Sequence, residues 1–138
     1  MQKTKLIIDT NIWVSYFMGK KIRAYLDKII ADERFDFYIS QNGLDELQQV
    51  LSRSKFQKYI TPVQIESLIV LLLRRCILVN VVTAVQLSRD AKDDFLLALS
   101  TTCQADYLLT GDEDLLVLKK VETTTIIKIA DFNSLFYS

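Results

Sequence analysis

Carboxylates are the side chains of this sequence that are best placed to do chemistry. The chain contains 17 aspartate and glutamate residues and no histidine. Without imidazole, Ser-His-Asp and Cys-His mechanisms and histidine-based zinc sites are excluded. Proton transfer and metal binding therefore fall mainly to carboxylates, which are the ligands that Mg²⁺ and Mn²⁺ prefer.

Acidic residues recur where a strand is predicted to end or a helix to begin. Asp9 directly follows the apolar run 6–8, and Glu46 lies on the flank of an apolar helical stripe. Two further segments are 89–95, with Asp90, Asp93 and Asp94, and 110–115, with Asp112 and Asp114. Taken singly, each acid has an ordinary explanation as a helix cap or a solvated residue.

Gathered together, these acids would acquire a chemical role. Two carboxylates about 4 Å apart repel each other by about 4 kcal/mol at an effective dielectric constant near 20. Either their pKa values rise or divalent cations lie among them. Such a cation lowers the pKa of bound water and stabilises both oxygens of an in-line phosphoryl displacement.

The elements that must position these acids can be read from the apolar periodicity. Strands are predicted at 5–8, 35–39, 77–82, 107–109 and 124–129, and helices at 22–30, 41–51, 62–75, 90–103, 112–119 and 132–136. Strands that alternate with helices predict one domain over residues 1–138, a three-layer α/β/α fold with a mainly parallel central sheet. Sites in such folds form outside the carboxyl ends of the strands, so Asp9 and the segment 110–112 should face the same crevice.

Composition limits the class of protein. The 17 Lys and Arg residues balance the 17 acids, which excludes a uniformly basic nucleic-acid binder. Two local patches, 19–23 and 53–59, combine cations with apolar or aromatic residues, a pattern of single-stranded nucleic-acid grooves and equally of solvated helix ends. Cys76 and Cys103 stand alone in apolar runs, which predicts reduced thiols in a cytoplasmic protein. No apolar run is long enough to span a bilayer, so no membrane contact is expected.

Four segments resemble the motifs of the PIN domain family, including its branch of VapC-like bacterial toxins that act in toxin–antitoxin pairs. They are Ile-Ile-Asp-Thr-Asn at 7–11, the helix 40–51 with Glu46-Leu47, the segment 89–99, and the segment 105–116 with Thr110-Gly111-Asp112. The resemblance covers nearly the whole chain, and its last motif is quite specific.

The resemblance implies which residues do the work. The catalytic acids would be Asp9, Glu46, Asp93 and Asp112, the metal ligands Asp9, Asp93, Asp112 and Asp114, and the supporting residues Asn11 and Thr110. Ala91 stands where this branch often has proline, so Asp94 or Asp90 can share the role of Asp93. The implied activity is Mg²⁺- or Mn²⁺-dependent endonucleolytic cleavage of single-stranded or structured RNA. The implied partners are the RNA substrate, an antitoxin protein and a second copy of the chain.

Two other functions stay open at this level. The chain can be a non-catalytic PIN-like module that binds RNA or protein and uses its acids as caps. It can also be a phosphatase with Asp9 as nucleophile. Position 11 counts against the phosphatase, because the haloacid-dehalogenase type of site requires a second Asp there and this chain has Asn11.

Overall fold

The structure is a computed structural model that describes residues 2–81 and 91–137, without the side chains of 91–94. In chain order its elements are β1 (Thr4–Ile8), α1 (Thr10–Ser15), α2 (Lys20–Ile30), β2 (Phe35–Ser40), α3 (Gln41–Leu51), a 3₁₀ turn (Ser54–Phe56), α4 (Pro62–Arg75), β3 (Cys76–Val79), α5 (Ala91–Cys103), β4 (Tyr107–Leu109), α6 (Glu113–Leu116), β5 (Lys120–Val121), β6 (Thr124–Ile127) and α7 (Ile129–Tyr137).

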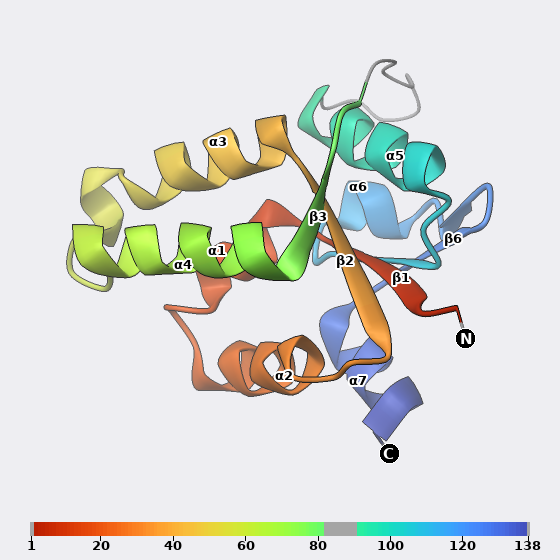
Figure 1. Cartoon of the computed structure of the whole chain (residues 1–138), viewed down its shortest axis with the longest axis horizontal. Coiled ribbons are helices and arrows are strands. Elements are labelled where there is room, and N and C mark those ends of the chain that lie inside the picture. Colours follow the sequence, from red (N-terminus) through yellow and green to blue (C-terminus); the bar gives the residue numbers. More distant parts are fainter. Residues whose placement is uncertain (1, 82–90, 138) are drawn as a thin grey trace.

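The strands form one sheet in the order β3-β2-β1-β4-β6-β5. Figure 1 shows β3, β2 and β1 side by side in this sheet. All neighbouring pairs are parallel except β5 and β6. The mainly parallel sheet predicted from the sequence is therefore confirmed. Because Ile8 lies opposite Leu109 in the pairing of β1 with β4, the residues that follow these strands emerge side by side. Those residues are Asp9 and Thr110.

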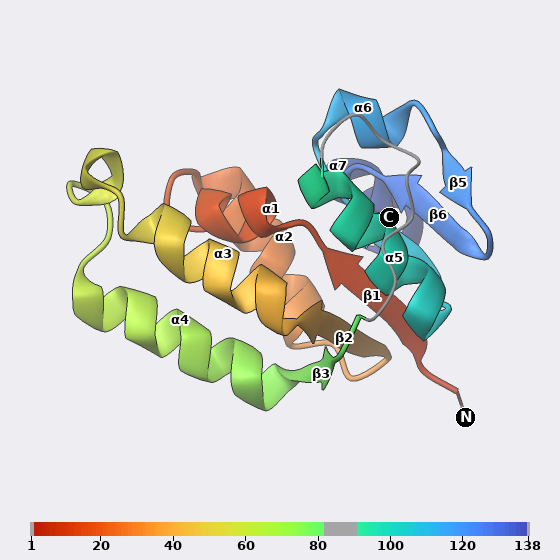
Figure 2. The same ribbon diagram turned by 90° about the horizontal axis from the view of Figure 1, so that it is seen from above.

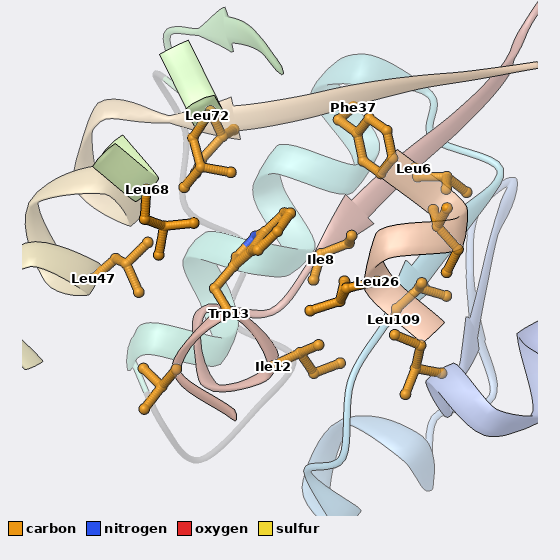
Figure 3. Close-up of a cluster of buried hydrophobic side chains, with 14 of the residues drawn as sticks. Leu6, Ile8, Ile12, Trp13, Leu26, Phe37, Leu47, Leu68, Leu72 and Leu109 are labelled. Carbon is orange, nitrogen blue, oxygen red and sulfur yellow. The ribbon is translucent and has the colours of Figure 1, made fainter. Parts of the chain in front are cut away.

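Alternation along the strands divides the core into two layers. Leu6 and Ile8 of β1 belong to one buried cluster, whereas Ile7 between them belongs to the other. The first cluster packs against α1, α2, α3, α4 and α7, and includes Trp13 (Figure 3). The second packs against α5 and α6. Helices on both faces of the sheet confirm the three-layer α/β/α prediction.

Capping residues fix where two of the helices begin. Ser40 accepts a hydrogen bond from the backbone N–H of Gly43 and starts α3. Thr61 and Gln64 form a reciprocal capping box at the start of α4, with Pro62 in its first turn. Both starts agree with the sequence prediction.

The predicted bounds were wrong around the short elements. The predicted helix 112–119 ends at Leu116 with Val117 as its C-cap, and Lys119, with φ 61°, lies outside the helical conformation. The predicted strand 124–129 ends at Ile127, because the carbonyl of Lys128 accepts the N–H of Phe132 as α7 begins. The predicted strand 77–82 runs from Cys76 to Val79, and its last predicted residue lies outside the described residues. The short α1 and β5 were not predicted.

In the part of the chain that the structure describes, no helix combines the length and the apolar character that crossing a bilayer requires. Figure 2 shows how α5 lies against the sheet. α5 runs back along β1, so the first turn of α5 lies at the carboxyl end of the strands, where Asp9 also lies (Figure 2).

Candidate active site

Asp9 is the central residue of the site. It follows β1 and caps α1, with its Oδ1 accepting a hydrogen bond from the backbone N–H of Asn11 at 3.1 Å. The interpretation of Asp9 as a helix cap is thus correct. Asp9 is nevertheless buried, with only 6% of its surface exposed, and an aspartate is rarely buried to this extent without a pairing partner.

Thr110 joins the exits of two parallel strands. Its hydroxyl donates to Oδ2 of Asp9 at 2.7 Å and accepts the backbone N–H of Asp112 at 3.0 Å. The Thr110 side chain is fully buried, so this geometry is held by packing as well as by hydrogen bonds. The prediction that Asp9 and the segment 110–112 meet at one edge of the sheet is confirmed.

Electrostatics at Asp9 favour its neutral form. Burial raises the pKa of the Asp9 carboxyl, and repulsion from Asp112 and Glu46 raises it further, while hydrogen bonds from Thr110 and Asn11 partly lower it. In the described part of the chain, no Lys or Arg forms a salt bridge with Asp9. The site therefore gathers negative charge around a buried carboxylate that no described cation pairs with directly.

Glu46 reaches this cluster from α3. It is half-buried, whereas its neighbour Asp45 is exposed and accepts a hydrogen bond from the Gln41 side chain. This difference is what the helical periodicity predicted for the two acids. Glu46 is close enough to Asp9 to raise the pKa of Asp9 by repulsion.

The fourth predicted motif forms a turn of its own. Asp112 caps α6, where its Oδ1 accepts the backbone N–H of Asp114 at 2.9 Å. Asp112 is half-buried beside Asp9, while Asp114 is exposed in the first turn of α6. Asn11 is also exposed and contributes its backbone N–H to Asp9 rather than a buried side chain.

The third predicted motif, residues 89–99, lies only partly within the described residues. Asp93 and Asp94 lie in the first turn of α5, but their side chains lie outside the described residues, as does the whole of Asp90. The backbone of this turn stands at the carboxyl end of the strands (Figure 2). The assignment of Asp93 as the third acid stays a prediction.

A cavity of about 480 Å³ opens beside Asp9 and Asp112. It is lined by Asp9, Asn11, Ile12, Ser15, Ile22, Thr110, Gly111, Asp112, Lys128, Ile129 and Ala130. Sequence reasoning missed Lys128. The signal was present, because Lys128 follows β6 directly, as Asp9 follows β1 and Thr110 follows β4.

Comparison with known proteins identifies the family. The family model of the PIN domain matches residues 5–114. This chain belongs to the PIN domain family. PIN domains are generally nucleases.

A solved structure supports the same fold. The chain resembles a chain in the crystal structure of VapBC2 from Rickettsia felis bound to a DNA fragment from their promoter, with a TM-score of 0.59 and 15% identity. The match covers 89% of this chain and 97% of that chain, and at this identity it concerns the fold alone. No curated protein matches the sequence.

The acids of this PIN domain suit a hard divalent cation. Among the described side chains, no three His, Cys, Asp or Glu residues form a group that could hold a metal ion. The buried carboxylate of Asp9, which forms no salt bridge among the described residues, and the neighbouring Asp112 supply oxygen donors of the kind that Mg²⁺ and Mn²⁺ take. The first turn of α5, which carries Asp93, lies at the same end of the sheet (Figure 2).

The two basic patches of this PIN domain lie largely outside the cavity. In the patch 19–23, Arg23 donates its Nε–H to the carbonyl of Tyr16 at 3.0 Å and stacks on the Tyr16 ring, so part of its charge serves the fold. In the patch 53–59 the cations are exposed around the 3₁₀ turn. Of all these residues, only Ile22 lines the cavity.

The cysteines take no part in this site. Both are free thiols, in agreement with the prediction of reduced cysteines. Burial raises the pKa of Cys76 to about 12 and that of Cys103 to about 11. Both thiols are therefore protonated near neutral pH, and neither is an activated nucleophile.

Proposed function

We propose that this PIN domain is an endoribonuclease that uses Mg²⁺ or Mn²⁺ held by Asp9, Asp112, Asp93 and Asp114. The observation that carries the proposal is the buried carboxylate of Asp9. Its pKa is raised by burial and by two neighbouring acids, with no cation paired to it in the described part of the chain. A divalent cation would supply the missing positive charge.

The protein groups have separate tasks in this proposal. Thr110 fixes one oxygen of Asp9 and the backbone of Asn11 fixes the other, so the carboxylate cannot rotate. Glu46 adds negative charge from α3 and is suited to accept a proton from the attacking water. The bound cation would lower the pKa of that water and neutralise charge that develops on the phosphate.

We further propose that the chain is the toxin of a toxin–antitoxin pair, working in the cytoplasm on single-stranded or structured RNA. The resemblance of its motifs to VapC-like toxins and the likeness of its fold to a chain of VapBC2 support this role. An antitoxin protein is then the expected protein partner, and a homodimer the expected assembly.

The second candidate is a non-catalytic PIN module. One observation favours it: Asp9 and Asp112 do cap helices, which gives both residues a structural use. The phosphatase alternative fits less well. Asn11 stands where that type of site needs its second aspartate.

Cleavage of a single-stranded RNA with Mg²⁺ or Mn²⁺, repeated with EDTA, tests the proposal. Cleavage should require the cation, and Glu46→Gln should lower the rate by about 100-fold, as expected for loss of a general base. Asp45→Asn is the matched control, because Asp45 is the exposed neighbour on the same helix. Cleavage that persists after exhaustive chelation contradicts the metal mechanism. No cleavage and no heat of Mn²⁺ binding would favour the non-catalytic module.

A further inference from the structure

The cavity beside the acids has a second character that the proposed chemistry does not use. Its acidic side is formed by Asp9 and Asp112. The remaining lining includes three isoleucines, Ile12 of α1, Ile22 of α2 and Ile129 of α7, and the cationic Lys128. Metal binding by carboxylates requires neither an apolar wall nor a lysine.

Lys128 is the one cationic residue that lines this cavity among the described residues. It is exposed, and in the described part of the chain it forms no salt bridge. Among the described residues, its charge is therefore not paired with Asp9, Asp112 or any other acid. An ammonium group available beside a nuclease site is suited to bind a phosphate oxygen of the substrate.

The apolar wall suits the face of a nucleobase. Recognition of unpaired bases relies on apolar and stacking contacts with bases that have left a helix. The cavity, at about 480 Å³, lies within the range of small-molecule sites. A base that is stacked and paired in a duplex cannot enter such a recess without first being extruded.

We propose that this cavity binds one unpaired nucleotide of the RNA, with the base against Ile12, Ile22 and Ile129 and a phosphate on Lys128. The inference rests on the proposed ribonuclease function and deepens it, because it makes an unpaired nucleotide next to the cleaved bond a requirement. Lys128 is then a substrate-binding residue, and the isoleucines select for single-stranded RNA.

Binding in the absence of metal tests Lys128 directly. Fluorescence anisotropy in EDTA should show that Lys128→Met binds a short single-stranded RNA about tenfold more weakly than the parent, which is the usual size of one charge-assisted contact. The slope of log affinity against log salt should fall by about 0.7. Lys120→Met is the control, because Lys120 is exposed on β5 and does not line the cavity, and it should bind within twofold of the parent. Equal binding by the two variants would overturn the role of Lys128.

The base-binding part is tested first by changing the RNA and then by changing one isoleucine. The parent should bind the intact strand several-fold more tightly than the same strand carrying abasic residues, and more tightly than the annealed duplex. Ile22→Ala should lose much of the preference for the intact strand, since Ile22 is the half-buried member of the apolar wall. If the parent binds intact and abasic strands equally, the cavity does not receive a base.

Cleavage measurements separate this inference from the proposed function. With Mn²⁺, Lys128→Met should raise KM about tenfold while kcat stays within twofold, because the lost contact is made equally in the bound and transition states. A parent that cleaves RNA, with KM unchanged in Lys128→Met, overturns the inference alone. A parent that never cleaves but shows the expected binding differences overturns the nuclease proposal alone.

Discussion

Two aspartates of this chain are treated in opposite ways by the fold. Asp32 lies in the turn between α2 and β2. It accepts three hydrogen bonds from the guanidinium of Arg34, the shortest at 2.7 Å, and one from the hydroxyl of Tyr137 at 2.7 Å. The bonds from Arg34 are the main cause that holds the pKa of Asp32 well below its usual range. Asp9 has no such cation within the described residues, and burial beside Asp112 raises its pKa.

The difference separates structural acids from candidate functional ones. An acid that serves only the fold is stabilised by a partner of opposite charge, as Asp32 is by Arg34. Asp9 costs the fold free energy when it ionises, and its neighbours Glu46 and Asp112 increase that cost. Carboxylates whose pKa values are raised in this way concentrate at functional sites, where a bound ligand or metal ion supplies the opposite charge.

The largest expected difference between the two aspartates is in the rate of RNA cleavage. Asp9→Asn should lower the rate of RNA cleavage by about 100-fold or more, because it removes a carboxylate that the cation requires. Asp32→Asn should leave the rate within twofold, since Asp32 does not line the cavity. Single-turnover cleavage with excess Mn²⁺ compares the two variants. Similar rates for both would mean that Asp9 is a cap and nothing more.

The sequence was sufficient to predict that Asp9 lies beside the segment that begins at Thr110. Asp9 and Thr110 follow apolar strands, and parallel strands end at the same edge of a sheet, so their proximity follows from the order of the elements. Glu46 was placed by helical periodicity alone. The same rule would also have given Lys128, which follows β6, had the end of that strand been placed at Ile127.

The lowered pKa of Asp32 was not predicted from the sequence. Its main partner, Arg34, is only two residues away, but a second partner comes from far along the chain. Tyr137 reaches Asp32 from the end of α7, a separation of 105 residues along the chain. The short elements α1 and β5 were not predicted for a related reason. α1 has six residues and β5 has two, too few for a hydrophobic period to appear. Both are defined by tertiary contacts rather than by propensity.

An intermediate effect is expected when the surroundings of Asp9 are changed and the residue itself is kept. Thr110→Val keeps the shape of a buried side chain but removes the hydroxyl that donates to Asp9 and accepts from Asp112. The pKa of Asp9 should rise further, so the rising limb of the cleavage rate against pH should move to higher pH. The free energy of unfolding should fall by about 1–2 kcal/mol.

Thr124→Val is the matched control for that change. Thr124 is equally buried, and its hydroxyl donates to the carbonyl of Ala105 at 2.6 Å, away from Asp9. It should lose a similar amount of stability and leave the pH profile where it is in the parent. A shifted profile in both variants would show that the shift reports general loosening rather than the hydrogen bond to Asp9.

The smallest expected effect concerns the stability of the metal-free protein. The pKa of Asp9 is raised above its ordinary value of 3.8, so the folded state binds the proton more tightly than the unfolded state. The parent therefore loses stability as pH rises from about the unfolded value through the raised one. Asp9→Asn escapes this loss and should be more stable by ~1 kcal/mol at neutral pH, about 4 °C in Tm, with no gain at acid pH.

Asp32→Asn should show the opposite dependence on pH. The pKa of Asp32 is lowered, so its contribution is complete above the unfolded value of 3.8 and is lost as pH falls through the lowered one. The substitution should cost ~1 kcal/mol at neutral pH, because the Arg34 side of the ion pair is exposed and such pairs contribute little, and nothing at strongly acid pH. Thermal melts in EDTA across pH measure both variants.

Excess Mn²⁺ should then raise the Tm of the parent and of Asp32→Asn but not that of Asp9→Asn, because only a site that keeps Asp9 gains stability from the cation. If Asp9→Asn melts like the parent at every pH, with and without Mn²⁺, the buried acid stores no repulsion and the two aspartates differ only in location.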